Sequence, residues 1–443
     1  MESSFGMQNQ TNFYIMKKYI YLFVLICSAL SVLQAQSGMG ISEKENGLEY
    51  WTEFNPKKKE YKEAKKILAG YITENTTLSS RDVYLLQGVV YVTNNATLTI
   101  EPGTVIRGDY TTCGTLVITK GAKIMAEGTE SFPIVFTTNK DTYSRKPGDW
   151  GGIIIMGDAP VNTFGGVGIL NFDLDPKYNR FGGENTESSS GVLKYLRIEY
   201  SGRKLSAKKE LNGISFAGVG NKTKIENIQI SYSNDDSFEF YGGNVKLEKL
   251  VSFRASDDDF DFTQGVQASI TNSLAIRHPY SSDAEKSRCM EIDSYDMIEK
   301  FDAQRNKTNV KASNVTFVNT EDNDQGLIKE AIFVADESYF SLNNSVVYGF
   351  KDFLLVKNYS FFEDFEEFIK LKNLVVGHCD NTLKTMQGDG NIAGMENNLF
   401  LSKNLISVSN GKIEDYFKIP TFEETPDFRY IKMERNNNIL VNK

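Results

Sequence analysis

The sequence predicts an all-β protein, a right-handed parallel β-helix with a helical cap at its N-terminal end. Three observations support this fold. Short runs of β-branched and apolar residues recur from Val83 onward, separated by Gly, Asn, Asp and Thr, as is typical of strands joined by turns. Two long segments match without a gap at a spacing of 22 residues, roughly the length of one coil in such repeat proteins. No long amphipathic helix interrupts the runs, which argues against βαβ units.

The N-terminal region has the pattern of a secretory signal peptide. Lys17 and Lys18 precede an apolar run over 19–29, and the small residue Ala35 follows. A basic start, a short apolar centre and a small residue at the cleavage point define such a signal. We therefore predict residues 1–35 to be a leader and signal peptide that truly starts at Met16, with cleavage near Ala35 or Ser37. The run is too short to span a membrane as a stop-transfer helix. The mature chain is expected to be secreted or held in the cell envelope, whether in the periplasm, on the outer surface or outside the cell.

Residues 36–82 are predicted to form an N-terminal segment whose helix, Lys57–Leu68, is rich in Lys, Glu and Ala. A solenoid has an open apolar end that must be covered, and this helix is the expected cap. The β-helix is predicted over 83–443. Its first strands are expected at Val83–Leu86, Val89–Val92, Leu98–Ile100, Thr104–Ile106, Leu116–Ile118, Ile134–Phe136 and Ile153–Ile155.

The internal repeat gives the register of the central coils. Ile225–Gly243 aligns with Leu247–Gly265, including an Asp-Asp-Ser-Phe-Glu-Phe segment above Asp-Asp-Asp-Phe-Asp-Phe. Looser copies follow at Ile270–Arg277, Val310–Val318, Phe340–Phe350, Ile369–Gly377 and Glu396–Asn404. An asparagine sits at comparable places in four coils, Asn272, Asn314, Asn344 and Asn373, which suits left-handed turns or an asparagine ladder.

The same alignment predicts which side chains fill the interior. Side chains alternate along a strand, so Phe238 and Phe240 share one face with Phe260 and Phe262. Ile214 and Phe216 precede this set. Met290 and Ile292 continue it after an insertion at Pro279–Ser287. We expect these apolar side chains to form the core.

Composition excludes several kinds of function. The net charge of −9 argues against nucleic acid and anionic membranes as partners. Cys27 falls inside the predicted signal, and the bulky Ile26 before it disfavours a lipoprotein site. The other cysteines, Cys113, Cys289 and Cys379, are odd in number and irregularly spaced, so they are not a disulfide framework. The only two histidines, His278 and His378, exclude a histidine-rich zinc site.

Further motifs carry a resemblance to a known family. They are Ala96–Ile106, Gly121–Thr129 with Pro133–Phe136, Gly148-Asp-Trp-Gly-Gly152 with Asp158–Asn162, Arg197–Gly202, the two acidic segments, and Arg277-His-Pro279. Together they cover about Val83 to Asp293. In this half the chain resembles the secreted right-handed β-helix proteins of Bacteroidota, which have the pectin-lyase-like fold. The resemblance implies the fold, but the family has no settled activity to transfer.

The face opposite the phenylalanines is acidic. By the alignment, Glu239, Asp261 and Glu291 form one column. Asp235 with Asp257, Ser237 with Asp259, and Tyr241 with Thr263 and Asp293 form three more. Asp236 and Asp258 lie at a corner, where alternation leaves their direction undetermined. Carboxylates on adjacent strands, about 4.8 Å apart, repel by roughly 3–4 kcal/mol at an effective dielectric of 20.

Calcium is one explanation of this patch, because Ca²⁺ accepts six to eight oxygen ligands in flexible geometry. The predicted ligands are Asp235, Asp257, Asp259, Glu239, Asp261, Glu291 and Asp293. The alternative is an acidic face solvated by water.

Two classes of function follow from the same residues. The first is a non-catalytic β-helix that binds a glycan or another cell-surface component, with Ca²⁺ bracing the acidic coils. The second is a polysaccharide lyase or glycoside hydrolase acting through coils 235–293. Its candidate catalytic residues are Glu239, Asp261, Glu291, Arg254 and Arg277. The sequence favours binding, because the acidic columns lack an evident base and substrate subsites.

Overall fold

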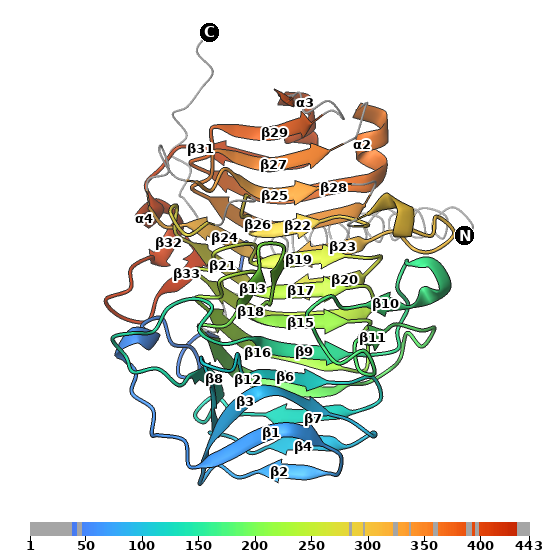
Figure 1. The fold of residues 1–443 in the computed structure, drawn as a ribbon. Helices are drawn as coiled ribbons and strands as arrows, with labels where there is room; N and C mark the ends of the chain where they lie inside the picture. Colours follow the sequence, from blue (N-terminus) through green and yellow to red (C-terminus); the bar gives the residue numbers. More distant parts are fainter. Residues whose placement is uncertain are drawn as a thin grey trace, which may run out of the picture.

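The computed structural model describes residues 38–41, 47–282, 286–295, 297–321, 327–335, 338–357, 362–386, 392–394 and 398–431. The chain winds as a stack of coils from one end of the molecule to the other (Figure 1). Each coil contributes strands to three parallel β-sheets, here named sheets I, II and III. The predicted parallel β-helix is therefore confirmed, whereas the predicted signal peptide at 1–35 lies outside the described residues. Within the described ranges, no helix has the length and apolar character that crossing a membrane requires.

Sheet I is formed by five whole strands and by the first halves of five longer strands that continue into sheet II. They are β2 (Thr76–Leu78), β4 (Thr97–Ile100), β7 (Lys123–Glu127), β20 (Gln267–Thr271), β23 (Asn309–Ser313) and the first halves of β12 (Gly191–Glu199), β16 (Lys224–Ser231), β18 (Asn244–Phe253), β26 (Tyr339–Tyr348) and β28 (Ile369–Gly377).

Sheet II takes the second halves of those five long strands. Its other members are β1 (Lys66–Ile72), β3 (Val83–Val92), β5 (Val105–Gly108), β8 (Ile134–Thr138), β21 (Leu274–Arg277), β24 (Thr316–Asn319) and β31 (Ile406–Ser409).

Sheet III begins with the last residues of β1 and β3 and carries the acidic segments. Its other strands are β6 (Thr115–Ile118), β9 (Gly152–Met156), β15 (Ile214–Ala217), β17 (Phe238–Tyr241), β19 (Phe260–Thr263), β22 (Met290–Ile292), β25 (Glu330–Val334), β27 (Asp352–Lys357) and β29 (Asn381–Met386), with β30 (Ile392–Gly394) antiparallel at the end. The three sheets enclose one continuous apolar core that runs from Leu78 to Ile406.

The turn between sheets I and II is left-handed in successive coils. Asn272, Asn314, Asn344 and Asn373 have φ of 51°, 54°, 50° and 55°. Asparagine tolerates this conformation better than other non-glycine residues. The Asn373 Nδ2 also donates a hydrogen bond to the Asn344 Oδ1 at 2.7 Å. Both uses predicted for these asparagines, turn and ladder, are therefore confirmed.

The predicted N-terminal helix is wrong. Pro56–Lys58 forms only a single 3-10 turn, and β1 begins at Lys66 and pairs in parallel with β3. The β-helix thus starts before the predicted boundary at residue 83. Two buried arginines bind this segment through its backbone carbonyls. Arg145 donates hydrogen bonds to the Pro56 and Lys59 oxygens at 2.9 and 2.8 Å, and Arg107 donates one to the Lys62 oxygen at 3.2 Å. These tertiary contacts outweigh a helix propensity worth only tenths of a kcal/mol per residue.

The segment before β1 covers the side of the stack rather than its end. Trp51 is fully buried, and Phe54 packs edge-on against Phe253 at 5.2 Å between ring centroids. The C-terminal elements α4 (Ile413–Tyr416), β32 (Phe417–Ile419) and β33 (Asp427–Tyr430) join the same apolar cluster. Both chain segments therefore shield the outer face of sheet II.

Helices cover the C-terminal end of the core. Phe365 of α2 (Phe362–Phe368) and Phe400 of α3 (Asn398–Lys403) both belong to the main core cluster and meet at 5.7 Å between ring centroids. The prediction of a further β-coil at Glu396–Asn404 is therefore wrong. The apolar residues of this run cover the open end of the core. In so short a run, their spacing resembles that of a strand.

Candidate functional site

The acidic segments lie where sheet II turns into sheet III. Phe238 pairs with Phe260 and Glu239 with Asp261, and β22 continues the register with Glu291 beside Asp261. This is the 22-residue alignment predicted from the sequence, and it is confirmed. The Glu239–Asp261–Glu291 column therefore exists as one row across three coils.

Phenylalanine stacking fixes the direction of these strands. The Phe238 and Phe260 rings stack at 5.3 Å, and the Phe240 and Phe262 rings at 4.8 Å. All four are fully buried in the core. Because side chains alternate along a strand, the carboxylate of Glu239 and its column point to the outer side of sheet III.

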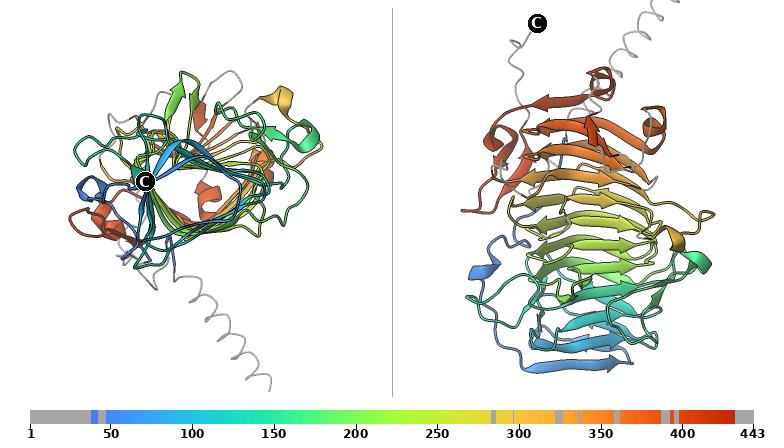
Figure 2. Two further views of the ribbon diagram at one scale, coloured as in Figure 1. Left: turned by 60° about the horizontal axis from the view of Figure 1, so that its bottom comes forward. Right: turned by 45° about the horizontal axis from the view of Figure 1, so that its top comes forward.

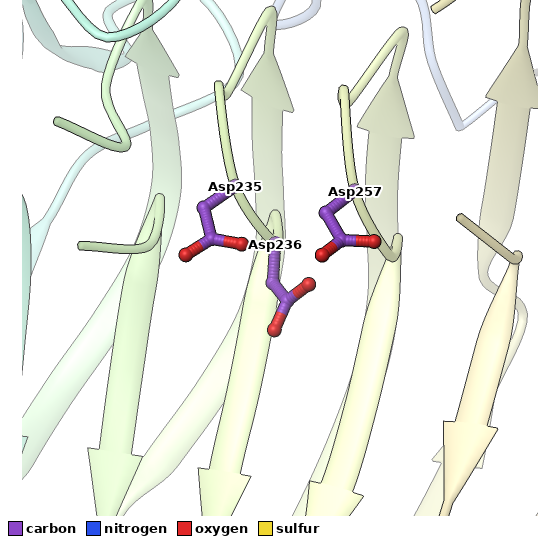
Figure 3. Close-up of side chains that lie close together, drawn as sticks. All are labelled: Asp235, Asp236 and Asp257. Carbon is purple, nitrogen blue, oxygen red and sulfur yellow. The ribbon is translucent and has the colours of Figure 1, made fainter. Parts of the chain in front are cut away.

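At the corner itself, strict alternation fails. The Asp236 Oδ1 accepts a hydrogen bond from the Asp258 backbone N–H at 2.9 Å, and the Asp258 carboxylate accepts one from the Arg288 N–H. These carboxylates therefore bridge successive coils. Figure 3 shows Asp235 and Asp257 side by side on neighbouring coils, with the Asp236 carboxylate lying between them.

Two groups of three carboxylates meet at Asp236. In Asp235–Asp236–Asp257, and again in Asp236–Glu239–Asp261, each residue offers an oxygen that lies within 4.8 Å of the others. We call these five residues the acidic cluster. Asp236 and Glu239 are 7% and 9% exposed, while the other three are half-buried. The cluster is therefore sunk into the surface but open on one side.

Burial and like charge act together on these carboxyls. Burial raises the pKa of Asp236 well above its usual range, and the carboxylates of Asp235 and Asp257 raise it further. The pKa of Asp261 is also well raised, first by burial and then by Glu239. Nearby negative charges disfavour the ionised form of a carboxyl. Binding of protons or of a cation would relieve this repulsion.

Two buried oxygens at the cluster have no hydrogen-bond partner. They are the Oδ1 of Asp261 and the Oδ1 of Asn212. The Asn212 Nδ2 meanwhile donates to Glu239 and to the Ser215 hydroxyl. Orphaned buried polar atoms are rare in folded proteins. Carboxylate and amide oxygens are ligands that Ca²⁺ prefers, so the residues present fit a calcium ion.

The remaining predicted ligands lie beside the cluster or apart from it. Glu291 forms an ion pair with Arg288, and Asp293 accepts a hydrogen bond from the Thr263 hydroxyl. Asp259 instead forms an ion pair with Arg277 at 3.0 Å, and both side chains are fully buried. This pairing neutralises Asp259, which belongs to neither carboxylate group.

The two arginines that align one coil apart have different surroundings. Arg277 also donates to the Arg288 carbonyl at 2.7 Å, so its guanidinium is enclosed. Arg254 lies over the rings of Phe253 and Phe422, at 5.2 and 5.3 Å from their centroids. The contacts that hold these two guanidinium groups are therefore an ion pair with Asp259 for Arg277 and aromatic rings for Arg254.

Sequence reasoning missed two residues of the site: Asp236 of the acidic cluster, and Asn212, which lies beside the cluster and donates to Glu239. Strict alternation would place Asp236 on the phenylalanine side, but its position at a corner leaves its direction undetermined from the sequence. The signal was present, since Asp236 recurs as Asp258 in the repeat and an acid cannot fill a phenylalanine-lined core without a partner. Asn212 follows a hairpin of β13 (Lys204–Ser206) and β14 (Lys209–Glu210), and nothing in its local sequence marks it.

A comparison with protein families agrees with this architecture. The pectate-lyase-like β-helix domain matches residues 70–416, about four-fifths of the chain. The chain belongs to this family. The match begins inside β1 and ends at the last residue of α4, so the pectate-lyase-like domain includes every strand of sheet III. Neither the curated proteins nor the solved structures gave a significant match. Membership in the family establishes the β-helix, and the activity has to be argued from the site.

Proposed function

We propose that this pectate-lyase-like β-helix is a secreted or cell-envelope protein that binds an acidic glycan through a calcium ion. Asp235, Asp236, Glu239, Asp257 and Asp261 would hold the ion. The carboxylate of a uronate unit would complete its coordination from the open side. The secretory location rests on the signal pattern at 16–35.

The observation that carries this proposal is Asp236. One buried carboxyl is shared by two carboxylate groups, and the four neighbours that raise its pKa are all acids. A divalent cation neutralises such a set, and Ca²⁺ tolerates a site that is open to further oxygen ligands. The half-buried Asp235, Asp257 and Asp261 leave that opening.

The burial and the contacts of the arginines favour binding over catalysis. A lyase needs a base that reaches the substrate. Arg277 is fully buried in its ion pair with Asp259, Arg288 is paired with Glu291, and the half-buried Arg254 lies over the rings of Phe253 and Phe422. A glycoside hydrolase is the second candidate. The oxygens of Glu239 and Asp261 lie within 4.8 Å, near the roughly 5 Å carboxyl separation of retaining enzymes.

The experiment is retention of the mature chain on immobilised polygalacturonate and on a neutral glucan. We expect retention on the uronate polymer in calcium, release by chelator, and loss in Asp236→Asn. The matched control is Glu130→Gln, which should bind like the wild type. Glu130 is an exposed acid that is distant from the cluster in the sequence. Retention that is unaffected by chelator, or no retention on either polymer, would overturn the proposal.

The same material tests the hydrolase alternative. Incubation with soluble polysaccharides, followed by measurement of chain length, should show no shortening. Turnover that Asp261→Asn abolishes would instead establish the enzyme.

A further inference from the structure

Lysine is concentrated in one short segment that precedes β1. Residues 57–66 contain six lysines and two glutamates, so this segment has a net charge of +4 in a chain whose total is −9. We call it the lysine segment. All six lysines are exposed, and they are Lys57, Lys58, Lys59, Lys62, Lys65 and Lys66.

Buried side chains hold the backbone of the lysine segment against the stack. Arg145 and Arg107 bind its carbonyls, and the Tyr61 hydroxyl donates a hydrogen bond to the buried Glu199 at 2.8 Å. Figures 1 and 2 show the segment, in blue, on the outside of the stack, where it runs toward β1. The exposed lysines therefore project into solvent from a backbone that is fixed by its contacts with the β-helix.

The lysines of this segment lack acidic partners. Among the residues that the structure describes, no carboxylate forms an ion pair with any of the six. Lysines on other parts of the surface do form such pairs, as Lys222 does with Glu187 at 3.1 Å. Lys57 instead lies over the ring of Tyr232, 5.7 Å from its centroid. The positive charge of the segment is thus left for a partner outside the chain.

The net charge of the whole chain does not describe this segment. At physiological ionic strength, exposed charges more than about 8 Å apart are largely screened from each other, so acids on remote coils have little effect here. Of the two glutamates in the segment, Glu63 lies close enough to the buried Arg107 for their charges to interact. The expectation that a net charge of −9 disfavours anionic membranes therefore does not extend to this surface.

Exposed apolar side chains flank the lysine segment in the chain. Ile67 directly follows it and is 64% exposed, and Tyr50 precedes it and is 77% exposed. Lysines combined with aliphatic and aromatic side chains are typical of segments that lie on a membrane surface. Each lysine near anionic lipids strengthens binding roughly fivefold, and stable attachment needs a second signal besides charge. The apolar side chains supply that second signal.

We propose that the lysine segment, together with Ile67 and Tyr50, is a docking surface for a membrane that carries anionic phospholipid headgroups. The lysines pair with headgroup phosphates, while the two apolar side chains enter the boundary between headgroups and acyl chains. A soluble polyanion offers the same charge but no apolar layer, so the combination favours a lipid surface. The docking surface shares no residue with the acidic cluster, and this inference does not depend on calcium binding.

The test is cosedimentation of the mature chain with lipid vesicles in chelator. One set of vesicles has three parts of phosphatidylcholine to one part of phosphatidylglycerol, and the other set is phosphatidylcholine alone. We expect binding to the anionic vesicles only, and weaker binding as salt is added. Asp236→Asn should bind like the wild type, because the acidic cluster takes no part.

A fourfold variant of the lysine segment tests whether the binding is local. It should bind anionic vesicles at least tenfold more weakly than the wild type. Its substitutions are Lys57→Gln, Lys58→Gln, Lys62→Gln and Lys65→Gln. The matched control changes the net charge equally at four exposed lysines of sheet I and should bind like the wild type. Its substitutions are Lys246→Gln, Lys311→Gln, Lys370→Gln and Lys372→Gln.

A second pair of variants tests the apolar contribution. Ile67→Ser should weaken binding by roughly three- to tenfold. Ile169→Ser, at an isoleucine of β10 (Gly168–Ile169) that is 60% exposed, should leave it unchanged.

Three results would overturn this inference. They are no binding to anionic vesicles, equal losses in the two fourfold variants, and no effect of Ile67→Ser, since charge alone would then account for the binding. Retention on polygalacturonate in calcium is measured separately, so failure of the membrane surface and failure of the proposed function are distinguishable.

Discussion

Two buried acidic regions lie on the outer faces of the sheets, and the charges around them differ. On sheet II, Glu199 is 1% exposed, accepts a hydrogen bond from the Tyr61 hydroxyl at 2.8 Å and lies 4.0 Å from the Arg197 guanidinium. The pKa of Glu199 is raised, first by burial, although the charge of Arg197 and the hydrogen bond from Tyr61 lower it. On sheet III, the charges that act most on Asp236 are all negative.

The difference lies in the charges that act most on each buried acid. The outer face of sheet II is covered by the N-terminal segment, which brings Tyr61 to Glu199. The acidic cluster on sheet III has an open side instead. Carboxylates that gather in one partly buried place raise one another's pKa values. We therefore interpret the cluster as a site completed from outside, and the Glu199 region as part of the folded framework.

The largest expected effect comes from breaking the buried Arg277–Asp259 ion pair next to the cluster. Arg277→Met leaves Asp259 buried without its partner and should lower the free energy of unfolding by about 3–5 kcal/mol. Arg254→Met, the same change one coil earlier, removes the contacts of a half-buried guanidinium with the rings of Phe253 and Phe422 and with the Tyr232 side chain, and should cost only about 1 kcal/mol. Denaturant unfolding in calcium measures both. Equal losses would show that the Arg277–Asp259 pair carries no special weight.

The next effect has opposite signs in the two regions. Without calcium at pH 8, Asp236→Asn removes one of several repelling carboxylates and keeps an oxygen for the Asp258 N–H, so the variant should be more stable by about 1–2 kcal/mol. Glu199→Gln leaves Arg197 without its carboxylate and should be less stable by about 1–3 kcal/mol. The measurement is denaturant unfolding in chelator. Destabilisation of both variants by similar amounts would contradict the comparison.

The smallest of these effects is a pH dependence confined to the calcium-free protein. The pKa values of Asp236, Asp258 and Asp261 are raised in the folded state, so the folded state binds more protons than the unfolded chain does. Stability from these groups is present at low pH and is lost as pH rises through the raised values. Calcium competes with the protons and should flatten this slope. Melting temperatures across pH 4–9 in chelator and in calcium check it, and identical slopes would count against a cation at the cluster.

The sequence was most informative where the chain repeats itself. The 22-residue match predicted the register of Glu239 on Asp261 and the inward direction of the phenylalanines, because both depend only on strand periodicity. It failed where a contact distant in sequence decides the conformation. Arg145 and Arg107 bind the backbone carbonyls of residues 56–62 from more than 40 positions away, and no local pattern reveals this.

The candidate site divides in the same way. The cluster members Asp235, Glu239, Asp257 and Asp261 follow from the repeat, as do their neighbours Glu291 and Asp293. Asp259 was grouped with them because it is acidic and aligned, but the buried Arg277 neutralises it. The direction of Asp236 depends on a corner where alternation ends, and Asn212 reaches Glu239 from a different loop. Both required the three-dimensional arrangement.

The central claim is that the acidic cluster binds calcium in the folded state. The most direct measurement is thermal unfolding of the chain from residue 36 onward in a calcium titration, with Asp236→Asn and Glu130→Gln in parallel. Binding at one hundred times the dissociation constant stabilises the folded state by about 2.7 kcal/mol. The melting temperature of the wild type and of Glu130→Gln should therefore rise with calcium concentration, and that of Asp236→Asn should not. A wild-type melting temperature unchanged at millimolar calcium would contradict the account.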